Sequence, residues 1–190
     1  MKVLLADGDP ARARALIADL AAMERVAVVR PLPGELLADA AARVQPDVVI
    51  VDMARPDRDG LEGIRRAYAH NPRPIVMFVD ADDPAFMRQA IAAGVSSYNV
   101  VGAALPDVKP IVQAAVAMFE RFRQVESGLQ RAEQALAERA AIEAAKARLI
   151  RQRGISEPQA YHWLRRQAMQ RGRRIAEIAQ EMLTGEEDKA

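Results

Sequence analysis

Short apolar runs alternate with amphipathic segments over the first part of the chain. The apolar runs lie at residues 3–6, 27–29, 47–52, 74–79 and 97–101, and segments with helical spacing of apolar residues separate them. Parallel strands need crossover connections, which are usually helices, so this alternation predicts a parallel sheet covered by helices on both faces. We therefore expect residues 1–117 to form an α/β, doubly wound domain with a five-stranded parallel sheet.

A long helical pattern follows, because between Pro106 and Arg153 the only potential helix breakers are Pro110 and Gly128. Inside it, apolar residues recur with the alternating spacing of four and three that marks a heptad seam. The seam consists of Met118, Phe122, Val125, Leu129, Ala132 and Leu136. A surface helix packed on its own domain is the alternative, but no neighbouring segment could cover this stripe. We expect residues 118–139 to be a coiled-coil linker that pairs with a second copy of the chain.

The apolar pattern shifts after Arg139 and predicts a three-helix bundle over residues 140–185, followed by a charged tail at 186–190. Gly154 suits the left-handed residue that ends a helix. Ser156 and Gln159 have the spacing of a capping box at the start of the next helix. Three short amphipathic helices can share a core only by packing together, so this stretch is expected to fold as one small module.

Basic charge is concentrated in this terminal module. The chain has a net charge of only +1, yet residues 139–176 contain ten Lys and Arg against two acidic residues. A compact, basic helical module suggests a nucleic-acid partner, although a solvated helix face is the alternative for any run of charge. The candidate contacts are Lys146, Arg148, Arg151, Arg165 and Arg166, together with the aromatic residues Tyr161 and Trp163.

The two aromatic candidates have different alternatives. Tyr161 falls on the apolar face of its helix, with Ala160 and Leu164, and is expected to lie in the core more than at a nucleic acid. Trp163, the only Trp, lies about 100° from the centre of that face. It could stack on an unpaired base or cover the flank of the bundle.

Three carboxylates are expected at one edge of the sheet. Asp7 and Asp9 follow the first strand and Asp52 ends the third. The carboxyl ends of parallel strands meet at the same edge, where open sheets place their sites. Carboxylates gathered there could hold a hard cation such as Mg²⁺.

Other classes of site find little support in the sequence. The chain has no Cys and only two His, which are far apart, so thiol catalysis, disulfides and Cys- or His-based metal sites are not expected. No Gly-rich phosphate loop and no paired nucleophile and base are present. No apolar run approaches the length of a membrane helix. We therefore expect a cytoplasmic protein that is not an enzyme and has no cofactor, with Mg²⁺ relevant only if the acidic pocket functions.

Two stretches resemble known families. LLADGDP and VDMARPDRDG resemble the motifs of response-regulator receiver domains, which implies a flavodoxin-like fold with Asp52 at the phosphoacceptor position. IEAAKARLIRQRGISEPQAYHWLRRQAM resembles the ANTAR domain, an RNA-binding module of bacterial antiterminators. The combination is similar to the NasT-type regulators of nitrate assimilation and to the AmiR-type amidase regulators.

The resemblance implies a function and a set of partners. An active homodimer would bind paired stem-loops in a leader mRNA and prevent a terminator from forming. A ligand-sensing repressor protein, NasS-like and responsive to nitrate or nitrite, would control it. The alternative is a phosphorylation-activated response regulator whose terminal helices bind DNA.

The receiver-like part departs from its family pattern at three positions. Gly8 stands where a second acid is usual, Val79 where a hydroxyl residue is usual and Val101 where a Lys is usual. Transfer of a phosphoryl group to a carboxylate needs a divalent cation and positive charge at the phosphoryl oxygens. We therefore expect phosphorylation of Asp52 to be weak or unused, and control to come from a partner protein.

Overall fold

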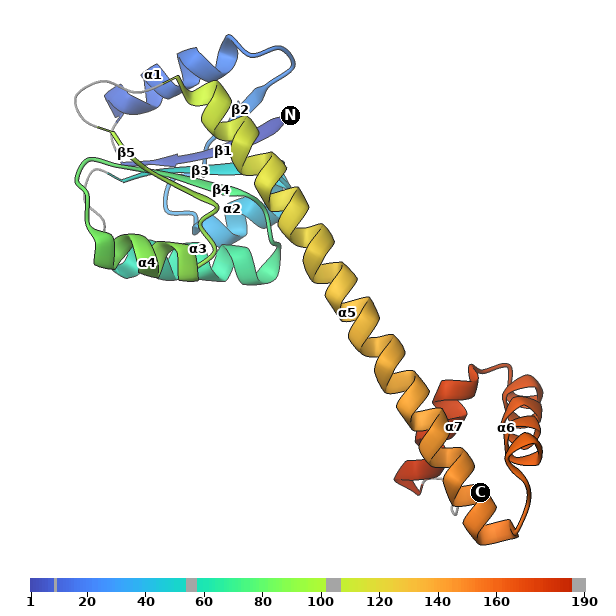
Figure 1. Ribbon diagram of the computed structural model, residues 1–190. Helices are drawn as coiled ribbons and strands as arrows, with labels where there is room; N and C mark the ends of the chain where they lie inside the picture. The colour runs from blue at the N-terminus through green and yellow to red at the C-terminus, as the bar shows by residue number, and fades with distance from the viewer. Residues whose placement is uncertain (9, 54–57, 102–106, 186–190) are drawn as a thin grey trace. The chain divides into compact units, whose positions relative to one another are not determined.

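The computed structural model describes residues 1–8, 10–53, 58–101 and 107–185 and divides the chain into two compact units, Met1–Arg123 and Gln124–Ala190 (Figure 1). The division falls inside one helix, α5 (Val108–Arg153). The two units are described in turn.

The first unit contains a five-stranded parallel sheet with strand order β2-β1-β3-β4-β5. Its strands are β1 (Lys2–Asp7), β2 (Ala27–Val29), β3 (Val48–Met53), β4 (Ile75–Val79) and β5 (Ser97–Val100). The intervening helices are α1 (Pro10–Ala21), α2 (Leu37–Val44), α3 (Arg58–His70) and α4 (Pro84–Ala92). The predicted doubly wound α/β domain is confirmed.

Alternate residues of each strand build two separate cores. Leu4, Val49 and Met77 face α2, α3 and α4, which cover one side of the sheet. Leu5 and Ile50 face α1 and the first turns of α5, on the other side (Figure 1). Successive strand side chains point to opposite faces, so a sheet buried on both sides needs continuous apolar runs, and the sequence has them.

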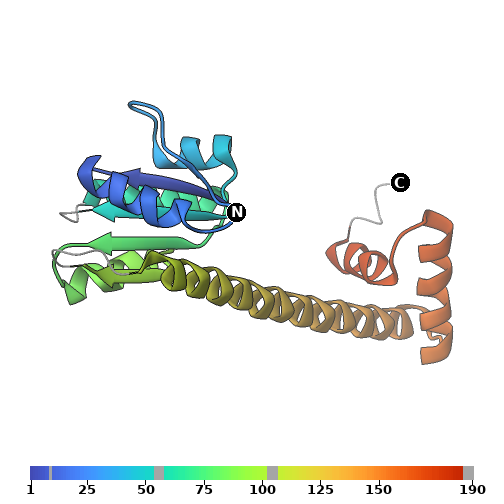
Figure 2. The ribbon, with the colours of Figure 1, turned by 90° about the horizontal axis from the view of Figure 1, so that it is seen from above.

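The long helical pattern forms one helix of 46 residues, α5, which Figure 2 shows without a break. Pro110 lies in its first turn, where a missing backbone N–H leaves no hydrogen bond unmade. Gly128 lies in its middle, and the helix passes through it. The expected coiled-coil linker and the first helix of the bundle are thus parts of a single helix.

The second unit packs the end of α5 against α6 (Glu157–Arg171) and α7 (Ile175–Thr184). Its core is built from Ala145, Leu149, Ala160, Leu164, Ala168, Ile178, Ala179 and Met182. Gly154 and Gly172 adopt φ angles of 62° and 61° after α5 and α6, as their left-handed positions require. The backbone N–H of Ser156 donates to Oε1 of Gln159 at 2.9 Å, which confirms this half of the expected capping box.

Among the described residues, no helix combines the length and the apolar character needed to cross a membrane. Although α5 is long enough, charged residues recur along its whole length.

Candidate functional sites: the strand-end pocket and the basic module

Asp7 and Asp52 lie beside each other at the carboxyl edge of the sheet. They end neighbouring strands and are in register in the pairing of β1 with β3. The side chains of Asp7 and Asp52 are 0% and 1% exposed, so both carboxylates are held away from bulk water. The third predicted acid, Asp9, lies outside the described residues. The structure therefore brings together two of the three expected carboxylates.

Two arginines meet these carboxylates. Nη2 of Arg12, on α1, lies 2.7 Å from Oδ1 of Asp52, and the same guanidinium also pairs with Asp80. Nη2 of Arg30, just after β2, lies 3.0 Å from Oδ2 of Asp7. A buried carboxylate is unfavourable without a cation close by, and here the protein supplies that cation from its own side chains.

Neither arginine was among the residues picked out from the sequence. Both could have been found by the rule that located the acids, because Arg30 directly follows β2, the strand beside β1. Arg12 lies in the first turn of the helix that follows β1. A search for acids at the carboxyl ends of strands does not include the arginines that pair with those acids.

The pocket as it stands does not fit a divalent cation. Mg²⁺ prefers a near-octahedral set of oxygen ligands, often one or two carboxylates and several waters. Both described carboxylates already pair with a guanidinium, so a metal ion bound to them would lie close to the positive charges of Arg12 and Arg30. No cluster of three metal-ligating side chains occurs among the described residues.

The three departures from the receiver pattern lie around this pocket. Val79, at the end of β4, is 0% exposed and packs in one core. Val101 is 3% exposed, packs in the other core and donates its backbone N–H to the oxygen of Val79. Gly8 is exposed. Val79 and Val101 are therefore buried apolar side chains at the two positions where a hydroxyl and an ammonium group would serve phosphoryl transfer.

In the second unit, Lys146 has a structural role. Its side chain is only 10% exposed, and Nζ lies 2.7 Å from carboxylate oxygens of both Glu143 and Glu157. These hydrogen bonds, with Glu143 contributing most, raise the pKa of Lys146. Because Glu157 is the first residue of α6, Lys146 fastens the start of α6 to α5.

Four of the arginines likewise have partners within the second unit. Nη1 of Arg148 donates to the backbone oxygen of Met182 at 2.7 Å and so satisfies a carbonyl near the end of α7. The others pair with carboxylates: Arg171 with Glu181, Arg173 with Glu177 and Glu181, and Arg174 with Glu138 and Glu177. These groups tie the ends of the helices together.

The remaining basic residues of the cluster are exposed and pair with no carboxylate in the described part of the chain. They are Arg139, Arg151, Arg153, Arg165 and Arg166. On the outer side of α6, a shallow hollow is lined by His162, Arg165, Arg166, Met169 and Gln170. Met169 is 74% exposed, which adds an apolar group to a basic surface. A surface of cations beside a soft apolar side chain can contact both phosphates and bases.

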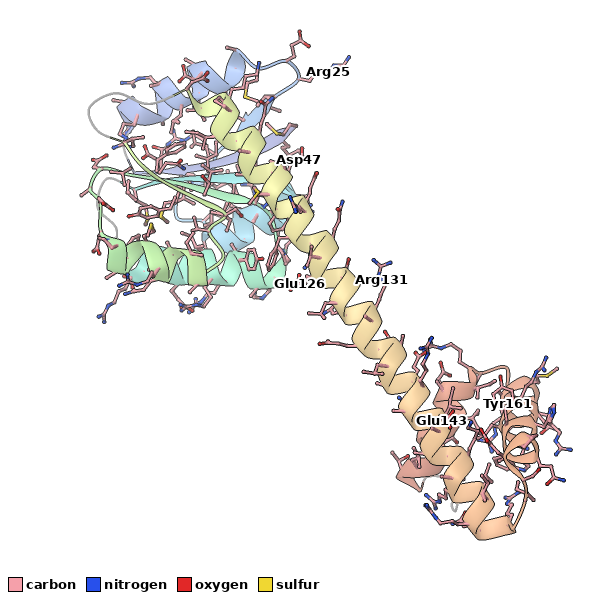
Figure 3. All side chains as sticks on the ribbon, viewed as in Figure 1. Arg25, Asp47, Glu126, Arg131, Glu143 and Tyr161 are labelled. Atoms are coloured by element: carbon pink, nitrogen blue, oxygen red, sulfur yellow. The ribbon has the colours of Figure 1, made fainter. Side chains whose placement is uncertain are left out.

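Tyr161 and Trp163 lie outside the centre of the core. Tyr161 is 41% exposed, with its ring centroid 6.5 Å from that of His162, so the expectation that it belongs to the core is wrong (Figure 3). The buried stripe of α6 is Ala160, Leu164 and Ala168, and Tyr161 lies at the edge of this stripe. Trp163 is partly buried against this core.

The expected seam of α5 is exposed along its length. Phe122 and Leu129 are 57% and 59% exposed, while Met118, Val125 and Leu136 exceed 60% and Ala132 is also exposed. Figure 3 shows this stretch of α5, where Glu126 and Arg131 are labelled. Exposed apolar stripes of this kind often mark an interaction surface.

Comparison with known proteins covers both parts of the chain. The model of the ANTAR domain family matches residues 130–183. The transcriptional regulatory protein PdtaR of Mycobacterium tuberculosis is 29% identical over 186 residues, which cover 96% of this chain and 90% of PdtaR. The aliphatic amidase regulator of Pseudomonas aeruginosa is 31% identical over 121 residues, which cover 62% of this chain and 61% of that protein.

The fold of the first unit also occurs in solved structures. The signal receiver domain of a modulated diguanylate cyclase from Desulfovibrio desulfuricans G20 is 21% identical, with a TM-score of 0.52. The match covers 63% of this chain and 95% of that domain, and it shows the receiver fold. The chain thus combines a receiver fold with an ANTAR domain over residues 130–183, and along nearly its whole length it is similar to the transcriptional regulatory protein PdtaR.

Proposed function

We propose that the chain binds paired stem-loops in a leader mRNA and thereby prevents a terminator hairpin from forming. The observation that carries this proposal is the ANTAR match over residues 130–183, on a module with five exposed basic side chains that pair with no carboxylate among the described residues. In this proposal residues 1–117 are the control domain, 118–139 the pairing linker and 140–185 the RNA-binding domain.

The contacts divide the basic cluster into two sets. Arg151, Arg165 and Arg166 are exposed and would contact phosphates, because a guanidinium matches a phosphate in charge and geometry. Lys146 and Arg148 are held by partners inside the module and would support those contacts indirectly. Tyr161, beside His162 on the exposed side of α6, is available for contact with RNA.

Pairing of two chains through the seam would explain how paired stem-loops are recognised. Two ANTAR modules joined by one coiled coil would each bind one stem-loop, and the second binding event becomes intramolecular. Arg121 and Glu126 flank the seam at the positions that face each other between parallel helices, so their opposite charges favour a parallel pair of identical chains.

Control by a sensor protein fits the pocket better than control by phosphorylation. The positive charge beside Asp52 already comes from Arg12, and the positions of the usual hydroxyl and Lys are held by Val79 and Val101. A NasS-like sensor that covers the seam or the basic face would keep the chain from RNA, and nitrate or nitrite bound to the sensor would release it. A ligand acts in this way only by binding two states of the sensor unequally.

The test is a mobility shift with candidate leader RNA, in which the sensor and then nitrate are added in turn. We expect binding to RNA, loss of binding with sensor and recovery with nitrate. Promoter duplex DNA is the competitor, and a preference for the duplex would favour the alternative of a DNA-binding regulator. Binding that ignored the sensor but rose after acetyl phosphate treatment, and not in Asp52→Asn, would restore control by phosphorylation.

A further inference from the structure

A stacked pair of side chains lies where α5 meets α6. Arg153, the last residue of α5, places its guanidinium carbon 4.6 Å from the centre of the Trp163 ring. Trp163 is partly buried and packs against the core of the second unit. Arg153 is exposed. The indole is therefore fixed by the fold, and the guanidinium lies on its accessible face.

The contact with Trp163 occupies only one face of the Arg153 guanidinium. A cation is favourable both at the end of a helix and over an indole ring, and these two effects place Arg153 where it is. A guanidinium is flat, however, and has a second face and five N–H donors. Arg148, Arg171, Arg173 and Arg174 donate to oxygens within the second unit, whereas Arg153 pairs with no carboxylate in the described residues.

The turn beside this pair leaves space for a ligand. Gly154 follows Arg153 directly, and a side-chain carbon built on Gly154 would meet nothing within 4 Å. Arg153 itself is exposed, so a flat group could approach the outer face of its guanidinium from solvent. Unpaired bases of RNA stack on aromatic rings and on guanidinium planes, and they also accept hydrogen bonds along their edges.

We infer that Arg153 and Trp163 form a stacking platform for one unpaired nucleobase of the bound RNA. The guanidinium lies between the indole and the base, and its outward N–H groups donate to the base edge or to the adjoining phosphate. This inference rests on the proposed function, since it names a subsite of the RNA-binding module. It assigns the recognition of a single-stranded loop to the end of α5, and leaves phosphate contact to Arg151, Arg165 and Arg166.

Trp163 makes the test direct, because it is the only Trp in the chain and its fluorescence reports on this site alone. The full-length chain first selects a ligand from a hairpin RNA library with a randomised loop. The selected hairpin is then titrated into the protein, in parallel with a fully paired duplex of the same length. We expect the hairpin to quench Trp163 fluorescence over the same concentrations that produce the mobility shift, and the duplex to leave the fluorescence unchanged.

Three variants separate stacking from charge. Arg153→Lys keeps the positive charge but loses the plane, so affinity for the hairpin should fall about tenfold, the typical loss for one stacked base. Arg131→Lys is the matched control, since Arg131 is an exposed arginine on the same helix, without an aromatic partner and outside the set proposed to contact RNA, and it should bind as the unchanged protein does. Trp163→Phe keeps a ring in the core and should bind less tightly than the unchanged protein, with thermal unfolding measured to confirm that it folds.

The outcomes distinguish this inference from the function on which it rests. If the hairpin binds while Trp163 fluorescence does not change and Arg153→Lys binds as tightly as Arg131→Lys, the platform is wrong and RNA binding stands. If the library yields no ligand, the proposed function itself fails. A loop base replaced by 2-aminopurine gives an independent readout, because stacking on the platform quenches it in the unchanged protein but much less in Arg153→Lys.

Discussion

The strand-end pocket and the terminal module both gather charge, but they use it in opposite ways. In the pocket, Arg12 and Arg30 form ion pairs with Asp52 and Asp7, so opposite charges balance each other within the fold. In the module, half of the basic cluster has internal partners and the other half faces solvent. The difference teaches that a count of charges says little about function until the partner of each charge is known.

The same contrast holds for the apolar residues of α5. Val108, Val112 and Ala115, in its first turns, are buried against the sheet. Met118 and Phe122, one to two turns further on, are more than half exposed. One helix therefore begins inside a core and continues as an exposed apolar surface.

Leu129→Glu should have the largest effect, because it places a charge in the middle of the exposed seam. A buried, unpaired carboxylate is strongly unfavourable, so the variant should be monomeric, and affinity for paired stem-loops should fall by roughly a hundredfold as two linked contacts become one. Sedimentation of the full chain and of the fragment 118–190 measures the first effect, and a mobility shift the second.

The matched control for the seam is Gln130→Glu, which adds the same charge at an exposed neighbour outside the seam. It should remain dimeric. An identical sedimentation profile for Leu129→Glu and Gln130→Glu, with the unchanged fragment a dimer, would show that the seam does not pair.

Arg12→Gln tests whether the pocket is complete in itself. It removes the guanidinium 2.7 Å from Asp52 and should lower the free energy of unfolding by roughly 3 kcal/mol, as when one partner of a buried ion pair is deleted. Mg²⁺ should restore part of that stability in the variant and have no effect on the unchanged protein. Thermal unfolding with and without Mg²⁺ measures both.

Arg14→Gln is the control for the pocket, since Arg14 lies on the same helix and is exposed. It should unfold like the unchanged protein. If Mg²⁺ stabilised the unchanged chain as strongly as it stabilised Arg12→Gln, the pocket would be a working metal site and the contrast with the module would fail.

Arg165→Ala should reduce RNA affinity about tenfold, because a charge-assisted hydrogen bond to a phosphate is lost. The slope of log affinity against log salt should also become shallower by about 0.9, the contribution of one phosphate contact. Arg173→Ala removes the same charge from a side chain that is paired with Glu177 and Glu181, and should change affinity less. Equal losses in the two variants would mean that net charge alone governs binding.

Lys146→Met should have the smallest effect on RNA binding and a measurable effect on stability, since Lys146 links α5 to α6. The raised pKa of Lys146 means that its contribution is present below its ordinary value of 10.5 and is lost as the pH rises above it. The lowered pKa of Glu157 means that its contribution is present above its ordinary value of 4.5 and is lost as the pH falls below it.

The difference in melting temperature between Lys146→Met and the unchanged protein should therefore be largest between these two limits and shrink beyond either. Thermal unfolding over a range of pH measures it. A melting temperature equal to that of the unchanged protein, combined with loss of RNA binding, would instead make Lys146 a direct RNA contact.

The local pattern of apolar and polar residues was sufficient to predict every described helix and strand of the chain. Each strand coincides within a residue or two with a predicted apolar run, and Gly154 ends α5 as expected. These features depend on residues close together in the sequence, because strand alternation, helical periodicity and caps are set by near neighbours. The one misplaced aromatic, Tyr161, sits at the edge of the apolar face of α6, where periodicity alone does not decide between core and surface.

The sequence by itself thus determined the two-part organisation, the parallel sheet, the long helix and the position of the basic cluster. Only the tertiary structure decided which charges are available. Arg12 meets Asp52 across 40 positions of the chain, and Arg148 reaches Met182 across 34. A charge pairs with whichever group the fold brings within a few ångströms, so its partner follows from packing and not from neighbours in the sequence.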